Sequence, residues 1–469
     1  MNKDGRLDAE LIYSAAGGEI FSGGEQFQVV SARAKRARYR PDEPWEIEFT
    51  LGGPDRVGPG QPLPRFRGDA VFRLQGWLGG NLRIGGITSF RHSGAHHSAR
   101  AWRLDHNSED LPEKPRQQHV IVSFVNAPTP PLQMGGEPIP DPDSGEVESW
   151  PIQTACGPAR YLRGQDVERL RGSSEDGEAR FWVPKLQLDL EPRRFRKRIE
   201  TFEDALGQDL QDICVILALI GRRHAAWHSI SILSLMEDGH VETAVSHRPG
   251  PPPVDSRDVA PLIHSKPFGA EAFHSLLENF RAHDLKATIE AAVVYTTAYY
   301  NSEYDDARLV YAFTALEALV NGWSASRNED VLVSDRDFAT LRSVVQPVVR
   351  RWAKAEGLDT ATRKQLYAKI GELRRPPIIP RVVRIVDSLS IQWDDLWEAG
   401  AGLAASLEQA YGRRSQFLHQ GTLPEWPSAR RDAIRVAVLA ERIVFALLGG
   451  SADWIWPPAY WEVRRERGL

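Results

Sequence analysis

The stretch RPGPPPVDSRDVAP at residues 248–261 divides the chain into two parts of different character. Prolines hold the backbone extended and remove hydrogen-bond donors, so this proline-rich stretch predicts a stiff linker rather than a helix or a strand. We therefore expect a β-rich N-terminal domain over residues 1–250, a linker over 251–265 and a helical domain over 266–469. A length of 469 residues fits two domains of ordinary size.

Before the linker, short runs of alternating apolar and polar residues are separated by glycine and proline. The clearest run is Trp45–Leu51, and similar runs are Ala70–Leu74 and His119–Val125. A period of two residues is typical of a strand with one buried face. The Gly- and Pro-rich segments between the runs supply many turns, so the first 200 residues predict a β-sandwich or a distorted barrel.

The N-terminal domain is expected to end in a helix and a hairpin. Apolar residues recur at helical spacing from Phe202 to Ile220 and stop at Gly221. Two alternating runs, Ala226–Leu235 and His240–His247, then flank a short turn, which is typical of a β-hairpin.

After the linker, apolar residues repeat at helical spacing. Eight helices are predicted, over residues 270–282, 284–300, 304–323, 335–356, 361–373, 381–389, 394–417 and 428–448. The chain is therefore expected to be of the α+β class, with an all-α C-terminal bundle. The tail DWIWPPAYW at 453–461 offers either a stacking platform for bases or aromatic side chains that pin the terminus, and we favour pinning.

Composition excludes several classes of protein. A net charge of -5 argues against a protein that coats nucleic acid through bulk charge, although a local basic patch remains compatible with it. The two cysteines, Cys156 and Cys214, lie far apart, so neither a disulfide framework nor a cysteine-based zinc site is expected. No apolar run is long enough to span a bilayer, and the N-terminus lacks the apolar core of a signal peptide. We expect a cytoplasmic protein with no membrane partner, no metal and no other cofactor.

One apolar stripe of the predicted helix 394–417 carries a charge. At about 100° per residue, Arg414 lies in the middle of that stripe and Arg413 points away from it. A guanidinium in that position must be paired, or must face a site or a partner surface. His419 lies about 140° further round a continuous helix, so it converges with Arg414 only if the helix ends or loosens just before it. Gly421 is a suitable residue for the exit.

A resemblance to a known family rests on two segments, ARLVYAFTALEALVNG (307–322) and YGRRSQFLHQG (411–421). Together they resemble HEPN domains of the ApeA-like branch, which show an aromatic-Leu-Glu-x-Leu core on one helix and a later Arg-Asn-x-x-x-His-Gly string. The matching positions are Phe313, Leu316, Glu317, Leu319, Arg414, His419 and Gly421. Ser415 stands where Asn is common, and Gln420 is inserted before the glycine. The β-rich half also looks like the N-terminal region that accompanies such domains in bacterial antiviral systems.

This resemblance implies a metal-independent endoribonuclease that acts in anti-phage defence by abortive infection. HEPN domains usually dimerise so that the Arg–His pairs of two protomers face one cleft. His419 is then expected to transfer protons, and Arg414 to hold the scissile phosphate, leaving a 2′,3′-cyclic phosphate. The implied partners are RNA (tRNA or another cellular or phage RNA), a second copy in a homodimer or higher even oligomer, and a phage-derived trigger at the N-terminal domain.

Further residues are expected to support the site. Ser415 is a candidate to steady the phosphate or the histidine. Glu317 is interpreted first as the structural partner of an arginine and second as a catalytic residue. Arg413, Arg430 and Arg431 are candidates to bind RNA, with a solvated helix face as the alternative for the last two.

Two alternatives to the nuclease remain open. One is a HEPN fold without catalytic activity that binds RNA or mediates dimerisation. The other is a β-rich domain that binds a small ligand or a carbohydrate, with helices that only form oligomers.

Two groups of histidines are candidate metal ligands. His92, His96, His97 and His106 lack a cysteine or carboxylate at ligand spacing, so contacts with solvent or substrate are favoured over a zinc site. His224 and His228 are four residues apart, but a strand is expected to begin before His228. One shared helical face is therefore not assured for that pair.

Overall fold

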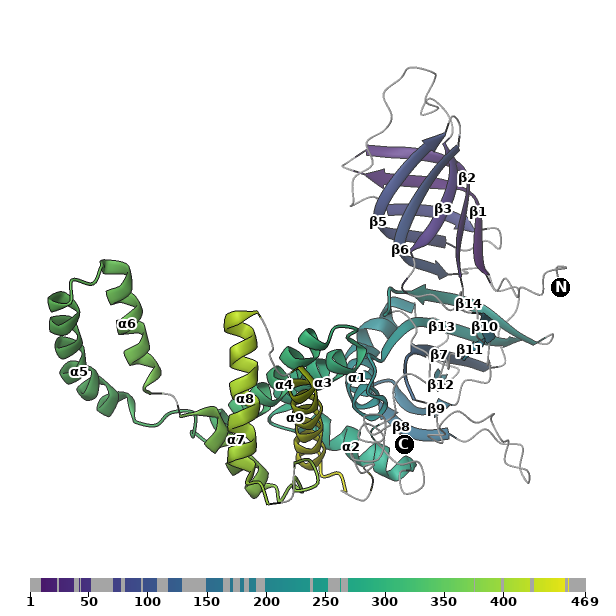
Figure 1. Cartoon of the computed structure of the whole chain (residues 1–469). Helices are drawn as coiled ribbons and strands as arrows, with labels where there is room; N and C mark the ends of the chain where they lie inside the picture. The colour runs from purple at the N-terminus through teal and green to yellow at the C-terminus, as the bar shows by residue number, and fades with distance from the viewer. Residues whose placement is uncertain are drawn as a thin grey trace. The chain divides into compact units, whose positions relative to one another are not determined.

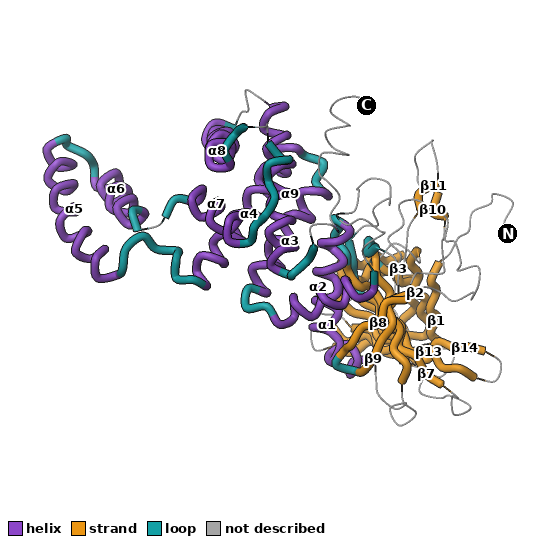
Figure 2. The backbone as a smooth tube through the Cα atoms, turned by 90° about the horizontal axis from the view of Figure 1, so that it is seen from below, coloured by secondary structure: helices purple, strands orange, loops and turns teal. Residues whose placement is uncertain are grey.

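The computed structural model divides the chain into two units, Met1–Leu277 and Glu278–Leu469, the first rich in strands and the second helical (Figures 1 and 2). This confirms the α+β class. The described residues are 10–22, 25–37, 42, 44–51, 71–76, 81–93, 96–107, 117–128, 149–162, 169–171, 178–180, 185–190, 199–236, 239–251, 262, 269–374, 376–397, 400–421, 426–451 and 454. Except for residues 251 and 262, the predicted linker 251–265 lies outside them.

Unit 1 is built on antiparallel strands. They are β1 (Glu10–Ser22), β2 (Glu25–Ala37), β3 (Trp45–Leu51), β4 (Val71–Gly76), β5 (Asn81–Ser93), β6 (His96–Asn107), β7 (Gln117–Val125), β8 (Ser149–Thr154), β9 (Gly157–Leu162), β10 (Arg169–Arg171), β11 (Glu178–Arg180), β12 (Lys185–Leu190), β13 (Ala226–Met236) and β14 (Gly239–His247). In the described part of the chain, one sheet runs in the order β3-β2-β1-β4-β5-β6-β14-β13-β7-β12-β9-β8, and β10 pairs with β11.

The first six strands close on themselves. β3 pairs with β2 on one side and with β6 on the other, so the ring β3-β2-β1-β4-β5-β6 returns to its start (Figure 1). The predicted strand Trp45–Leu51 is confirmed with the bounds expected, and its residues alternate between buried and more exposed positions. Trp45 and Ile47 are 0% exposed, at the centre of the apolar core of this ring.

The second half of the sheet packs against a helix. α1 (Ile199–Gly221) lies against β13 and β14, and both this helix and the hairpin agree with the expected elements. Aromatic side chains from distant segments fill the core there. Trp150 lies 4.9 Å from Phe273 between ring centres, and Tyr161 lies 5.9 Å from Trp150. Phe273 comes from the part of α2 that belongs to unit 1.

The helices that follow β14 are α2 (Ala270–Ala282), which crosses the unit boundary, and α3 (Lys286–Asn301), α4 (Asp305–Ser326), α5 (Asp335–Ala355), α6 (Thr360–Glu372), α7 (Ile378–Ser388), α8 (Leu403–Gln420) and α9 (Trp426–Leu447). The predicted helix 394–417 is wrong at both ends. Its start moves to Leu403 because Gly400 adopts a left-handed φ of 89°, which interrupts the helix.

Unit 2 is centred on α3, α4 and α9, which pack on one another. α7 packs on α4, and α8 packs on α7 and α9, whereas α5 and α6 pack on each other as a hairpin (Figure 1). In the tail, the Trp454 ring lies 5.9 Å from that of Phe445, as expected for aromatic pinning. Trp456, Tyr460 and Trp461 lie outside the described residues.

Packing between α3 and α4 gives a stability prediction. A Cβ added at Gly322 would lie 2.9 Å from the Cβ of Thr288, closer than real atoms approach. Thr288 is β-branched and stiff, so Gly322→Ala must separate the helices, and we expect a loss of about 1–3 kcal/mol. Chemical denaturation measures it.

Gly412 is the matched control, because a Cβ there meets nothing within 4 Å and the residue is exposed in α8. Gly412→Ala should stabilise unit 2 by about 0.5–1 kcal/mol through helix propensity. Equal effects of the two substitutions would contradict the close approach of α3 and α4.

Candidate functional site

Helix α8 carries the residues on which the predicted site depends. It runs from Leu403 to Gln420 without interruption and is capped by Gly421, whose φ of 67° is left-handed. The N–H of Gly421 donates to the Phe417 carbonyl over 2.8 Å. The exit at Gly421 is as predicted. The loosening expected before His419 is not found, because the helix continues past that residue.

Arg414 is held by a carboxylate on α4. Its Nη1 lies 3.2 Å from Oε1 of Glu317, and its Nη2 lies 3.4 Å from Oε2. Its guanidinium carbon lies 5.6 Å from the centre of the Phe313 ring and 6.0 Å from that of Tyr411, within the range of cation–π attraction. The structural partner that the sequence assigned to Glu317 is therefore Arg414.

Glu317 lies near two cations. Burial raises the pKa of its carboxyl group, and the charges of Arg414 and of Arg381 on α7 oppose that rise. Arg381 also donates to Oδ1 of Asn321 over 2.8 Å. Burial raises the pKa of the Tyr411 phenol as well, which keeps it neutral. We call these residues the Arg414 cluster: Phe313, Glu317, Arg381, Tyr411 and Arg414.

Arg381 was not identified from the sequence. Its helix has Val382, Ile385 and Val386 buried and Arg384 exposed, which is an ordinary amphipathic pattern. Such a pattern predicts that an arginine lies on the polar side of the helix. It does not predict which carboxylate, some sixty residues away, that arginine faces.

Ser415 and His419 are exposed on the last turns of α8. Leu418, Ser415 and His419 lie about 40°, 100° and 140° round the axis from Arg414, and the rise from Arg414 to His419 is about 7.5 Å. Leu418 is 50% exposed. We call this surface the α8 arc, made of Arg414, Ser415, Leu418 and His419. Within one chain, the arginine and the histidine border the arc and do not meet.

The three candidate RNA-binding arginines differ in their surroundings. Arg413 donates from Nε to Oδ2 of Asp432 over 2.6 Å, and the Asp432 side chain is only 1% exposed. Arg413 thus joins α8 to α9. Arg430 and Arg431, in contrast, are exposed near the start of α9. Of the three, these two present their charge to solvent.

The histidines considered as metal ligands give no cluster in the described residues, where no group of three or more His, Cys, Asp or Glu could hold a metal ion. His224 lies in the turn after α1, and His228 lies in β13, as expected. Burial, reinforced by the charge of Arg36, lowers the pKa of His228 to about 3. The side chains of His92, His96, His97 and His106 lie outside what the structure describes.

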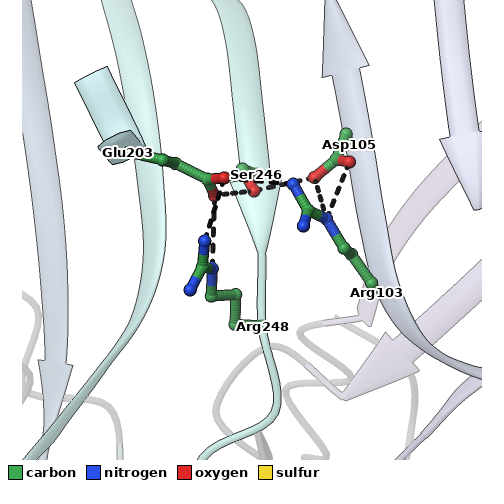
Figure 3. Close-up of polar contacts among 5 residues, drawn as sticks. All are labelled: Arg103, Asp105, Glu203, Ser246 and Arg248. Carbon is green, nitrogen blue, oxygen red and sulfur yellow. Dashed lines mark hydrogen bonds and ion pairs between the residues drawn. The ribbon is translucent and has the colours of Figure 1, made fainter. Parts of the chain in front are cut away.

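A second polar group, drawn in Figure 3, lies in unit 1 around Glu203 of α1. The Glu203 side chain is 4% exposed, and its Oε2 lies 3.0 Å from Nη2 of both Arg103 and Arg248. Arg103 also donates from Nε to Asp105 over 2.9 Å. Ser246 lies between the two carboxyl groups (Figure 3). The group therefore ties α1 to β6 and to the end of β14.

The Ser246 hydroxyl reaches both carboxyl groups but has one proton to donate. Its Oγ lies 2.7 Å from Oδ1 of Asp105 and also contacts Oε1 of Glu203. One carboxyl group must therefore carry a proton when both contacts are hydrogen bonds. Burial raises the pKa of Asp105. Burial alone would raise the pKa of Glu203 too, but hydrogen bonds from Arg248 and Ser246 lower it below its ordinary value. Of the two carboxyl groups, Asp105 therefore has the higher pKa relative to its ordinary value and takes up a proton first as the pH falls.

Comparison with family models, with curated proteins and with solved structures found no match. Among the described helices, none combines the length and the apolar character that a membrane span requires. Neither result bears on the chemistry of the Arg414 cluster or of the α8 arc.

The Glu203 group predicts how unit 1 responds to acid. Because the folded pKa of Glu203 lies below its ordinary value, its ionised form contributes stability at neutral pH, and that contribution is lost as the pH falls through the lowered pKa. Glu203→Gln should cost about 2–4 kcal/mol at neutral pH, because it leaves two arginines without their shared carboxylate. It should also flatten the acid limb of stability against pH, measured by urea denaturation.

Asp105→Asn is the matched control. An amide can donate to the Ser246 hydroxyl as a protonated carboxyl group does. This variant should lose less than half the stability lost by Glu203→Gln. A larger loss in Asp105→Asn would contradict the assignment of the proton to Asp105.

Proposed function

We propose that the chain is a HEPN endoribonuclease that cleaves RNA without a metal ion and acts in anti-phage defence, with unit 1 as the part that senses the trigger. The observation that carries this proposal is the α8 arc. It carries a half-buried guanidinium next to an exposed hydroxyl and an exposed imidazole at one helix end, and these groups suit phosphate binding and proton transfer.

Two copies of the chain are needed for this chemistry. On a continuous helix the Arg414 and His419 side chains diverge by about 140°, so they do not reach one phosphate from the same chain. Two α8 helices that meet antiparallel across the arc bring Arg414 of one copy beside His419 of the other. The exposed Leu418, between them on the arc, supplies apolar area for that contact.

The reaction is a transfer of a phosphate ester within the RNA. The 2′-oxygen bonds to the adjacent phosphorus while the bond from phosphorus to the 5′-oxygen breaks. His419 of one copy accepts the proton of the 2′-hydroxyl, and the departing 5′-oxygen takes a proton from water. Arg414 stabilises the added charge on the phosphate. The products are a 2′,3′-cyclic phosphate and a 5′-hydroxyl, and DNA is excluded because it lacks the nucleophile.

Glu317 competes with the phosphate for Arg414. The ion pair is partly open to solvent, with the Arg414 side chain 21% and the Glu317 side chain 30% exposed. Burial raises the pKa of Glu317, and the charge of Arg414 opposes that rise by favouring the ionised carboxylate. We assign to Glu317 the role of positioning Arg414 before the phosphate arrives.

A second candidate function is a HEPN module that binds RNA or dimerises without cleaving. The ion pair between Arg414 and Glu317 favours it, because binding Glu317 is enough to explain why an arginine occupies this position without a role in catalysis. This alternative predicts that RNA is captured without turnover. Capture would then be unchanged in His419→Gln.

Substitutions on the α8 arc test the nuclease. Arg414→Ala and His419→Ala should each reduce RNA cleavage by at least about 100-fold, because each removes a group that acts in the transition state. Cleavage of a labelled RNA in EDTA, with analysis of the product ends, measures the effect. Gln420→Ala is the matched control on the same helix turn, and it should cleave as the parent does.

Cyclic phosphate ends that form at the parent rate in both arc variants would contradict the assignment. So would cleavage that requires Mg²⁺. If the parent chain, shown to be folded by circular dichroism, binds RNA without cleaving it, the RNA-binding module without catalysis is the better description.

The exposed arginines of α9 predict a separate effect on affinity. Arg430→Ala with Arg431→Ala should weaken RNA binding and reduce the slope of log K against log salt by about 1–2, because each phosphate contact releases counterions. The cleavage rate at saturating RNA should stay at the parent value. Binding titrations at several salt concentrations measure the slope, and an unchanged slope would assign these residues to a solvated helix face.

A further inference from the structure

Helix α5 has apolar residues around nearly half of its circumference. One stripe is sheltered: Phe338, Val345 and Val349 are half-buried and Ala353 is buried, on a helix whose packing partner is α6. These residues are spaced seven, four and four positions apart, so they share one face. The sheltered stripe accounts for the cohesion of the α5–α6 hairpin.

A second apolar stripe lies beside the first and is open. Leu341 is 39%, Val344 63%, Val348 53% and Trp352 51% exposed. Their spacing places all four within about 80° of the helix circumference. A continuous open stripe of four large apolar side chains is unusual on an isolated surface and marks a place of contact with another molecule. We call it the α5 stripe.

The charges on α5 indicate what covers this stripe. Asp337 in the first turn and Arg351 near the other end border the stripe, whereas the other charged residues near the two ends of the helix point away from it. A second α5 running antiparallel would place acidic ends against basic ends and oppose the two helix dipoles favourably. A pairing centred near Val344 brings Asp337 of one copy opposite Arg351 of the other.

We propose that the α5 stripe is the docking surface for a second copy of this chain, with the two α5 helices antiparallel about a twofold axis. The same patch meets itself, as in an isologous interface. Two α5–α6 hairpins then form a four-helix bundle, with Leu341 and Val348 of opposite copies facing each other. This contact goes beyond the proposed nuclease, because it uses none of the residues of the α8 arc.

Self-association of the full-length chain tests the docking surface. Sedimentation equilibrium over a range of protein concentrations should show a reversible dimer or a higher even oligomer. Val344→Asp with Val348→Asp should weaken association through this face by at least about 100-fold, because it buries four carboxylates per pair of chains. Val294→Asp is the control, since Val294 is 57% exposed on α3, away from the stripe.

Charge reversal tests the antiparallel orientation. In Asp337→Lys alone, a lysine faces Arg351 of the other copy. In Arg351→Asp alone, an aspartate faces Asp337 of the other copy. Like charges therefore repel in both variants. Each variant should associate about 10-fold more weakly than the parent, and an equimolar mixture should recover the parent affinity. Asp337 also accepts from the N-cap Ser334. Recovery on mixing cannot come from that cap, because mixing does not restore it.

Three outcomes would overturn the docking surface. The first is a parent chain that stays monomeric at about 100 μM. The second is a Val344→Asp, Val348→Asp double variant that associates as tightly as the parent. The third is a mixture of the two charge-reversed chains that does not recover the parent affinity. A monomeric parent would point to a different occupant, such as a helix of another protein. A monomeric parent would also contradict the two-copy site of the nuclease, whereas the other two outcomes leave the nuclease untouched, because RNA cleavage by Arg414→Ala and its parent is measured separately.

Discussion

The roles proposed for Arg414 and His419 depend on the continuity of α8. Because the helix runs unbroken to Gln420, Arg414 turns toward Glu317 on α4 while His419 turns toward solvent. A break before His419 would have allowed one chain to assemble the pair by itself. Without that break, the pair can act together only across two chains. The same helix therefore binds α4 through Arg414 and presents Ser415 and His419 to solvent.

Two surfaces of unit 2 are proposed to bind a second copy, and they use different helices. The α8 arc combines polar groups with one exposed Leu418, whereas the α5 stripe is apolar with charged ends. A chain with two separate isologous surfaces builds a closed assembly of four copies or an open array, and a chain with one builds a dimer. Unit 1 differs from both, because the charged groups around Glu203 bind one another and hold α1 to the sheet.

Local patterns predicted the elements well, and long-range contacts poorly. Period-two alternation located β3 with its exact bounds, and helical spacing located α2, because one buried face leaves a direct trace in the sequence. The pairing of β3 with β6, which closes the ring, joins segments about fifty residues apart and leaves no such trace. At the site, an arginine on an apolar stripe predicted a partner, and Glu317 fits. Arg381 could not be foreseen, because its role depends on how α7 packs against α4.

We propose that one RNA-cleaving site takes Arg414 from one copy and His419 from another. Mixing Arg414→Ala with His419→Ala, after the chains have exchanged subunits, tests it most directly. Mixed dimers contain one composite site with both groups intact, so cleavage should rise to about a quarter of the parent rate, although each variant alone is inactive. A mixture that stays as inactive as its components, with exchange verified by differently labelled chains, would contradict the shared site.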